Sequence, residues 1–206
     1  MIIIITGSKG DGKTLLGTYL THILHDKGLK VLSNYKFNKI SYTKATIERL
    51  FMHILKDKKI LNTVVILDEI QTLVDSRRFS SDINLLISYF ALQTRKTNVY
   101  LIGTTQHFDM IEKRMRDNCD IMIECESFEI VNGKWIKLIE GQAKNQDNVI
   151  IRGTIYKKFN KVFSKVNTIN IKAKYVYDLY DTTQVIKMDP MKIKSIMKKI
   201  KNEDLT

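Results

Sequence analysis

Residues 7–14 read Gly7-Ser8-Lys9-Gly10-Asp11-Gly12-Lys13-Thr14, directly after the apolar run Ile2-Ile3-Ile4-Ile5-Thr6. This is the pattern G-x-x-x-x-G-K-[ST] behind a short buried strand and ahead of helically spaced leucines, which is the context a P-loop requires. Its glycines let the backbone curl with N–H groups pointing inward, and the helix that follows directs its positive dipole end at the same concavity. The stretch therefore predicts a phosphate-binding loop.

The side chains of this loop suit the phosphates and the metal ion of a nucleoside triphosphate. Lys13 can reach the β- and γ-phosphates, and the Thr14 hydroxyl can ligate Mg²⁺. We expect ATP to be held by the loop and the start of the helix, through Gly7, Ser8, Lys9, Gly10, Asp11, Gly12, Lys13, Thr14 and Leu15.

The composition predicts one compact domain. The chain has 206 residues, 44% hydrophobic, with one proline and nine glycines, so no linker divides it. We expect one ATPase domain over residues 1–185: a nucleotide-binding core (1–125) and a basic β extension (126–185). A basic, partly helical tail would follow over 186–206. The apolar runs are too short to span a bilayer and no signal peptide is recognisable, which predicts a cytosolic protein.

The few cysteines and histidines suggest no metal or redox site. Cys119 and Cys125 have a spacing that matches no such motif, so we expect two reduced, half-buried thiols. The four histidines form no ligand set, although His22 and His25 share a helix face.

Positive charge is concentrated late in the chain. The net charge is +12; residues 1–133 have 18 basic and 15 acidic side chains, whereas 134–174 have 10 and 2. The tail from Val185 has six lysines and three acids. A polyanionic partner would explain the excess, and a lysine-rich surface that only maintains solubility is the alternative.

Hydrophobic periodicity predicts an α/β fold with a central, mostly parallel sheet flanked by helices. Helices are expected over Lys13 to about Asp26, ended by Gly28, and over 47–56, 83–94, 110–115 and 190–201. Parallel strands are expected over Val31–Asn34, Val64–Leu67, Val99–Gln106 and Ile121–Ile123. After Glu124 the pattern becomes antiparallel, with a hairpin of 128–131 and 134–138 around Asn132-Gly133 and strands over 149–157 and 168–177.

The strand Val64–Leu67 ends in Asp68-Glu69, which is a Walker B motif. Carboxyl ends of parallel strands face the ligand in open α/β sheets, so Asp68 would hold Mg²⁺ together with Thr14. Glu69 would polarise and orient the attacking water, which favours hydrolysis over transfer to an acceptor.

Gln106 ends the next predicted strand. If that strand lies between the P-loop and Walker B strands, its amide points at the γ-phosphate, as in the additional-strand, catalytic-glutamate class of P-loop NTPase. Thr105 is the neighbouring alternative, and a polar strand end without a catalytic role is the third.

The transition state of ATP hydrolysis also needs a positive charge to stabilise it. In many oligomeric P-loop ATPases an arginine of a neighbouring subunit supplies this charge. Five arginines are candidates, of which Arg95 closes the helix before the Gln106 strand and Arg116 follows Gln106; any one alone could equally be a solvated surface charge: Arg77, Arg78, Arg95, Arg114 and Arg116.

Together these motifs resemble the FtsK/HerA superfamily, and within it the viral genome-packaging ATPases and the Zot-like proteins. The resemblance covers residues 1–125 well and the rest loosely. The matching segments are 7–14, 66–71, 93–98, 103–106, 109–111 with Arg116, and Tyr177-Asp178-Leu179-Tyr180-Asp181-Thr182.

The resemblance implies an ATP- and Mg²⁺-dependent motor on double-stranded DNA. It also implies a homo-oligomeric ring, a hexamer, with Arg95 acting in trans. From the sequence we expect neither the membrane segment of many Zot-like proteins, nor the DNA-reading domain of FtsK, nor the N-terminal barrel of HerA. Its size best matches packaging ATPases of small tailless viruses, which work in the host cytoplasm and can dock on a capsid protein.

Several other functions remain as alternatives. A Zot-like or other P-loop ATPase could drive virion assembly, DNA transfer or recombination. A small P-loop kinase would need an arginine-bearing lid and no Glu69. A deviant-Walker partition ATPase would place lysine where Ser8 stands, and a non-hydrolysing scaffold would not need Asp68-Glu69.

Overall fold

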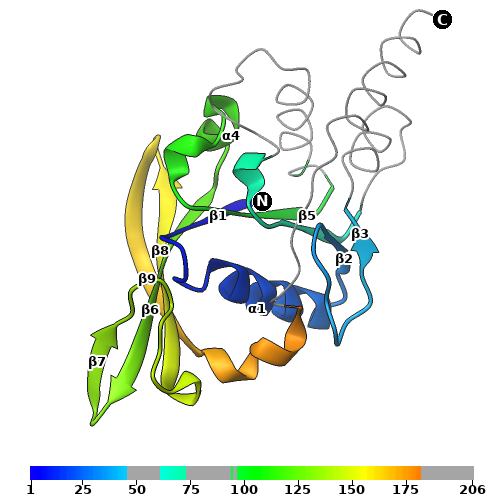
Figure 1. Cartoon of the computed structure of the whole chain (residues 1–206). Coiled ribbons are helices and arrows are strands. Elements are labelled where there is room, and N and C mark those ends of the chain that lie inside the picture. Colours follow the sequence, from blue (N-terminus) through cyan, green and yellow to red (C-terminus); the bar gives the residue numbers. More distant parts are fainter. Residues whose placement is uncertain (46–60, 73–93, 95–96, 182–206) are drawn as a thin grey trace, which may run out of the picture.

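A computed structural model describes residues 1–45, 61–72, 94 and 97–181. The nine strands in these residues form one sheet in the order β3-β2-β4-β5-β1-β6-β8-β9, with β7 paired to the second half of β6 (Figure 1). The sheet is mostly parallel at its centre and antiparallel beyond β6, as the sequence predicts.

The parallel part carries the P-loop and Walker B motifs. It contains β1 (Ile2–Thr6), β2 (Lys30–Ser33), β3 (Thr43–Lys44), β4 (Thr63–Leu67) and β5 (Val99–Thr105). Every residue of β1 and β4 is buried, which explains their unbroken apolar sequence. β5 lies between β4 and β1, so the strand order required by the additional-strand class is present.

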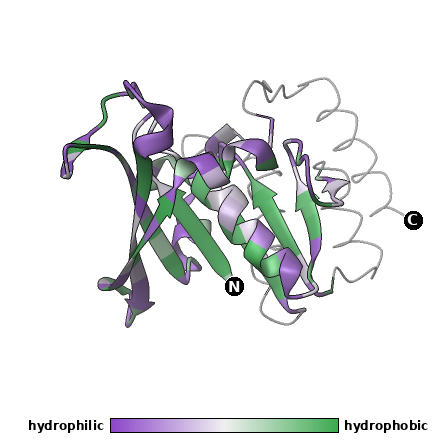
Figure 2. Cartoon of the chain, turned by 90° about the horizontal axis from the view of Figure 1, so that it is seen from below, coloured by the Kyte–Doolittle hydropathy of each residue, from purple (hydrophilic) through white to green (hydrophobic). Residues whose placement is uncertain are grey.

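Each face of the sheet is covered by different elements. The helix α1 (Lys13–Asp26) packs Leu15 and Leu16 into one apolar core. On the opposite face lie η1 (Ile70–Thr72), η3 (Phe108–Met110) and α4 (Lys113–Asp117), which enclose a second core. Figure 2 shows hydrophobic residues concentrated in the central strands, with α1 lying across them.

The antiparallel part continues the same sheet without a break. β6 (Ile121–Val131) runs parallel to β1 over residues 121–124 and antiparallel to β8 (Val149–Phe159) over 121–129. β9 (Val162–Lys172) forms the edge, and β7 (Lys134–Lys137) closes the predicted hairpin at Asn132-Gly133, where both φ angles are positive. The strand β6 thus crosses the boundary that we expected between core and extension at residue 125.

After β9 the chain returns toward α1 in short turns. η5 (Ala173–Tyr175) and η6 (Tyr177–Leu179) follow the edge strand, and Tyr180 bridges to Phe37 behind β2. A further turn, η4 (Gln146–Asn148), precedes β8. The returning segment places aromatic residues near the P-loop.

Two local predictions were wrong. Instead of one helix over 110–115, η3 and α4 are separated by Ile111 in an extended conformation, and the Glu112 carboxylate caps α4 by accepting from Arg114 N at 2.8 Å. The strand expected over 168–177 is β9, which starts earlier because Asn160 and Lys161 make a turn at positive φ, and which ends at Lys172.

Other predictions fall outside the described residues. These are the helices over 47–56 and 190–201, all but Thr94 of the helix over 83–94, the tail 186–206, and Arg77, Arg78 and Arg95.

Candidate nucleotide-binding site

The P-loop joins the carboxyl end of β1 to α1. Gly7, Gly10 and Gly12 all have positive φ, and α1 begins at Lys13 as predicted. At Gly10 a side chain is excluded as well as strained, because a Cβ there would lie 2.1 Å from the carbonyl carbon of Glu140. The loop is therefore packed tightly against the segment around Glu140 from the antiparallel part.

The loop is also held by its own side chains. The buried carboxylate of Asp11 accepts from Ser8 N at 2.6 Å, and Lys13 Nζ donates to Ser8 O at 2.7 Å. Burial lowers the pKa of Lys13 from its usual 10.5, although nearby acids oppose this. Anionic phosphate groups near Lys13 would favour its charged form.

Asp68 directly follows β4 and is fixed by three other segments. The Thr14 hydroxyl donates to Asp68 Oδ1 at 2.8 Å, and the Thr104 hydroxyl donates to the same oxygen. Asn34 holds its backbone on both sides: Asp68 N donates to Asn34 Oδ1 at 2.8 Å, and Asn34 Nδ2 donates to Asp68 O at 2.9 Å.

This oxygen-rich arrangement fits Mg²⁺. The ion prefers one or two protein oxygens together with water and phosphate oxygens. Thr14 Oγ1 and Asp68 Oδ1 already touch at the mouth of the P-loop and would hold the ion there. When bound, it would neutralise charge on the β- and γ-phosphates.

Glu69 adopts an unusual backbone conformation next to Asp68. Its φ is +50°, in the left-handed region, and its N–H donates to Thr104 Oγ1 at 2.9 Å. The side chain is exposed. Strained residues of this kind cluster at active sites, where the surrounding structure fixes an otherwise unfavourable orientation.

The residues at the end of β5 have different partners. Gln106 is exposed, and its carbonyl accepts from Gly7 N at 3.4 Å, so its backbone adjoins the start of the P-loop. Thr105 donates to His107 O and faces away from Asp68. Thr104, the next-to-last residue of β5, contacts both Walker B residues.

Sequence reasoning missed Thr104 and Asn34. Both are polar residues at or beside the carboxyl end of a buried parallel strand, which is the same signal that identified Asp68. Alternation along β5 would have placed Thr104 with Gln106, but it does not reveal hydrogen-bond partners.

Of the candidate arginines, only Arg114 and Arg116 lie in the described residues. Both belong to α4: Arg114 lies 3.9 Å from Glu112, and Arg116 pairs with Asp109. They lie on the sheet face opposite α1.

A cavity of about 580 Å³ extends from the P-loop toward the antiparallel strands. Its lining combines P-loop residues with apolar and aromatic side chains, and burial raises the pKa of Tyr180, which keeps the phenol neutral. The lining residues are Gly10, Gly12, Lys13, Thr14, Leu15, Ser127, Leu138, Glu140, Gly141, Val149, Ile151, Tyr177 and Tyr180.

The antiparallel part is thus a wall of the site. Ser127 Oγ donates to Gly10 O at 3.2 Å and Cys125 Sγ donates to Asp11 O at 3.0 Å, so β6 braces the loop from behind. A cavity lined by a phosphate-binding loop and by apolar and aromatic side chains suits a nucleotide. Both cysteines are buried, at 1% exposure, more deeply than expected.

Within the described residues, no helix combines the length and hydrophobicity needed to cross a bilayer.

Three solved structures share the fold at low sequence identity. The N-terminal domain of zonular occludens toxin from Neisseria meningitidis aligns with a TM-score of 0.56 and 20% identity, over 87% of this chain and 98% of that one. The genome-packaging NTPase B204 of Sulfolobus turreted icosahedral virus 2, in complex with AMPPCP, gives 0.52 and 15%, over 81% and 96%. The DNA-packaging ATPase B204 of Sulfolobus turreted icosahedral virus gives 0.50 and 16%, over 81% and 96%.

These are the two kinds of protein that the sequence resemblance named. No curated protein sequence matches the chain. The profile of the ATPase family associated with various cellular activities (AAA) matches residues 3–127 and thus spans the P-loop, Walker B and β5. This match covers more than half of the chain and includes the residues that meet at Asp68, and the chain therefore belongs to the AAA family of ATPases.

Proposed function

We propose that the protein is an ATP-hydrolysing DNA translocase that packages a viral genome. The observation that carries the hydrolytic part is the meeting of Thr14, Thr104 and Asp68, with Glu69 held next to them. This arrangement supports an Mg²⁺-bound triphosphate beside a carboxylate that can orient water.

Glu69 and Gln106 are the proposed catalytic groups on the water. Glu69 polarises the water and the Gln106 amide contacts the γ-phosphate or the water, while Lys13 stabilises the phosphates. Thr14 and Asp68 hold Mg²⁺, and residues 7–15 bind ATP. The strand order supports the role of Gln106, because β5 ends between the two motif strands.

The DNA part of the proposal rests on charge and on the structural neighbours. Residues 134–174 carry ten basic and two acidic side chains. Two structures of the same fold are described as genome- or DNA-packaging enzymes. We infer duplex DNA as the polymer, the cytoplasm of a host cell as the location, and a capsid protein as a transient partner.

A ring is part of the same proposal. Arg95 would reach the nucleotide of a neighbouring subunit, as in the hexamers of the FtsK/HerA type. A trans arginine can be worth about 10³ to 10⁵ in rate, so an isolated subunit would hydrolyse ATP slowly.

The test combines an ATPase assay with a native mass measurement. Wild-type protein should hydrolyse ATP, release inorganic phosphate and be stimulated by duplex DNA, and it should form a ring with a non-hydrolysable analogue. Glu69→Gln should abolish turnover and still bind ATP, whereas turnover close to wild type in that variant would refute the mechanism. Phosphate transfer to another nucleotide would indicate a kinase instead.

A Zot-like assembly ATPase is the second candidate. The Zot domain has a TM-score of 0.56 and is covered over 98% of its length. In that case ATP hydrolysis would depend on Glu69 in the same way, but no nucleic acid would stimulate it at low salt.

A further inference from the structure

A second cavity lies away from the nucleotide site and is surrounded by cations. It has a volume of about 290 Å³ and shares no lining residue with the P-loop cavity. It lies on the sheet face opposite α1, where η3 and α4 meet the tip of the β8–β9 hairpin. Its lining residues are Phe108, Asp109, Lys113, Arg116, Asp117, Lys158, Lys161 and Phe163.

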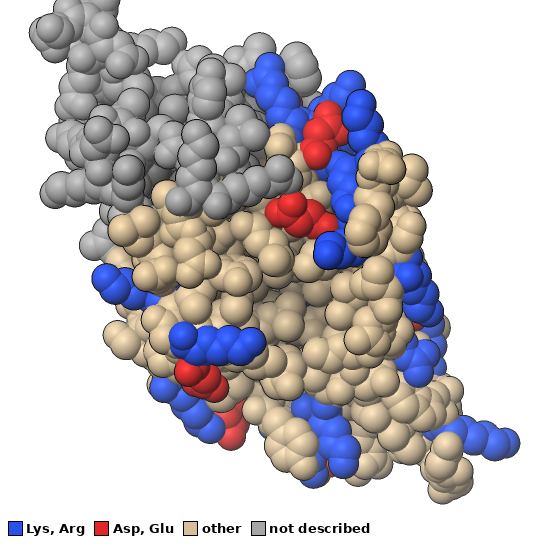
Figure 3. Space-filling model, turned by 180° about the vertical axis from the view of Figure 1, so that it is seen from behind, with Lys and Arg blue, Asp and Glu red and all other residues tan. Residues whose placement is uncertain are grey.

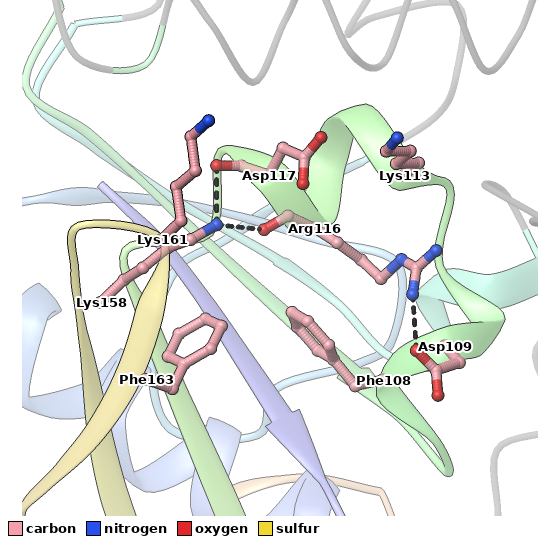
Figure 4. A pocket seen from close by; sticks show the side chains of 8 residues that line it. All are labelled: Phe108, Asp109, Lys113, Arg116, Asp117, Lys158, Lys161 and Phe163. Carbon is pink, nitrogen blue, oxygen red and sulfur yellow. Dashed lines mark hydrogen bonds and ion pairs between the residues drawn. The ribbon is translucent and has the colours of Figure 1, made fainter.

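Figure 4 shows the two phenylalanine rings along one side and the cationic groups along the other. Phe108 and Phe163 pack edge to face at 5.6 Å and join the core, so they form a rigid wall rather than a free stacking surface. Four cationic and two acidic side chains give the cavity a formal charge of +2. This net positive charge favours the binding of an anion in the cavity.

The four cationic side chains differ in their hydrogen bonds and ion pairs to other residues of the protein. Lys158 Nζ donates to Arg116 O and Asp117 O at 3.1 and 2.9 Å and so caps α4. Arg116 pairs with the exposed Asp109, while its Nε is buried with no hydrogen-bond partner in the described part of the chain. Lys113 and Lys161 are exposed, and Lys161 belongs to the hairpin turn.

The charge continues from this cavity along the edge of the sheet. Between Asp147 and Asp178 the chain has seven Lys or Arg residues and no Asp or Glu. Lys157, Lys165 and Lys172 are exposed on β8 and β9, and Figure 3 shows Lys and Arg along this edge. Lysines on an edge strand also prevent sheet-to-sheet association, but that does not explain the cations around the cavity.

The dimensions favour a long polymer over a small anion. β8 and β9 have 11 residues each, so the hairpin is about 36 Å long at roughly 3.3 Å per residue. One turn of duplex DNA is about 34–36 Å long and carries a phosphate charge on average every 1.7 Å or so of its axis.

We propose that the cavity between α4 and the β8–β9 hairpin binds a backbone phosphate of duplex DNA, with the β9 edge continuing the contact. This surface is called the α4–hairpin surface below. The inference rests on the proposed function for the identity of the polymer and adds where it binds. Contacts to phosphates carry no sequence information, so binding here is independent of base sequence.

The test compares duplex affinity with its salt dependence. In full-length protein, the double variant Lys113→Ala/Lys161→Ala removes two cations that cap no helix, and Lys27→Ala is the matched control at an exposed lysine after α1 on the opposite face. The affinity of the double variant for a 30-bp duplex should fall about tenfold at low salt, and the slope of log K against log salt should fall by about 1.8. Lys27→Ala should change neither quantity.

Asp109→Asn gives a prediction of opposite sign. It removes a carboxylate that competes with phosphate for Arg116, so duplex affinity should rise about threefold or more. All three variants should keep the wild-type melting temperature, ATP affinity and DNA-free ATPase rate, because none of these residues touches the nucleotide cavity.

The outcomes separate the two proposals. If wild-type protein binds duplex DNA and the double variant keeps both affinity and slope, the α4–hairpin surface is refuted while the translocase stands. If the wild-type protein binds no DNA, both the translocase proposal and the α4–hairpin surface are refuted. Preference for single-stranded DNA, equal competition by polyglutamate, or saturation by inorganic phosphate at matched ionic strength would each overturn duplex DNA as the ligand.

Discussion

Thr14 donates a hydrogen bond to Asp68, 54 residues later in the chain, across 2.8 Å. The Asp68 oxygen that accepts this bond also accepts one from Thr104, and Asn34 holds the Asp68 backbone. Three other segments therefore fix the position of one carboxylate. Because Mg²⁺ demands near-ideal octahedral geometry, such support is what a catalytic metal site requires.

Thr104→Val should impair catalysis more than nucleotide binding. Valine has the same shape but removes the donor to Asp68 and the acceptor of Glu69 N, at a cost of about 1 kcal/mol in stability. We expect kcat to fall about tenfold or more and the Mg²⁺ concentration for half-maximal activity to rise, with little change in Mg²⁺-free ATP affinity. Thr104→Ser keeps the hydroxyl and should restore both quantities. An unchanged Mg²⁺ titration in Thr104→Val would show that Thr104 does not position Asp68.

Gly10→Ala should disrupt the site through packing. A Cβ at Gly10 meets the Glu140 backbone at 2.1 Å, whereas at Gly28, which also has positive φ, nothing lies within 4 Å. Both substitutions incur the cost of a left-handed alanine, about 1 kcal/mol. Only Gly10→Ala should also weaken ATP binding, by about tenfold or more, and lower the melting temperature further. Equal effects of the two variants in thermal melts and ATP titrations would contradict this account.

Tyr177→Ala should weaken the binding of ATP but not of inorganic tripolyphosphate. Tyr177 lines the cavity, and a base packed on an aromatic ring is stabilised by about 1–3 kcal/mol, or roughly fivefold to 150-fold in Kd. Tyr175 is 67% exposed and does not line the cavity, so Tyr175→Ala is the matched control. Calorimetric titration with both ligands checks this. An equal loss of affinity for ATP and for tripolyphosphate in Tyr177→Ala would show that the base does not pack on Tyr177.

Cys119 should contribute to alkaline unfolding. Burial raises the pKa of its thiol from 9.0 to about 12, so above pH 9 the unfolded chain loses a proton that the folded protein retains. Stability from this group is complete below pH 9 and falls by about 1.4 kcal/mol per pH unit up to about pH 12. Cys119→Ala should lose less stability than wild type between pH 8 and pH 11 in urea denaturation. Parallel losses in the two proteins would mean that Cys119 does not titrate in this way.

Arg95 should act on the nucleotide of a neighbouring subunit. Arg95→Ala and Glu69→Gln are each expected to be inactive alone, but a mixed ring contains some sites with both an intact Glu69 and an intact Arg95. Mixing the two variants should therefore recover part of the ATPase rate, with Lys13→Ala plus Glu69→Gln as the control mixture that cannot recover through a trans arginine. Absence of recovery in rings that demonstrably exchange subunits would argue for action within one subunit.

Much of the fold followed from local patterns. Unbroken apolar runs located β1, β4 and β5, and Asn132-Gly133 located the β6–β7 hairpin, because burial on both faces and turn geometry leave direct marks on sequence. The break between η3 and α4 was missed because Ile111 is apolar and buried, and a buried apolar residue fits a helix and an extended segment equally well. The Asn160-Lys161 turn was missed because it contains no glycine.

The sequence by itself determined that this chain has a phosphate loop, a Walker B carboxylate pair and a basic C-terminal third, since each is a property of neighbouring residues. Only the tertiary structure decided that Thr104 and Asn34 fix Asp68, and that the β extension forms a wall of the cavity beside the P-loop. It alone brought the tip of the β8–β9 hairpin to α4. The hydrogen bonds among these segments join residues 34 to 117 positions apart, and strand order, which sets them, leaves no local mark in the sequence.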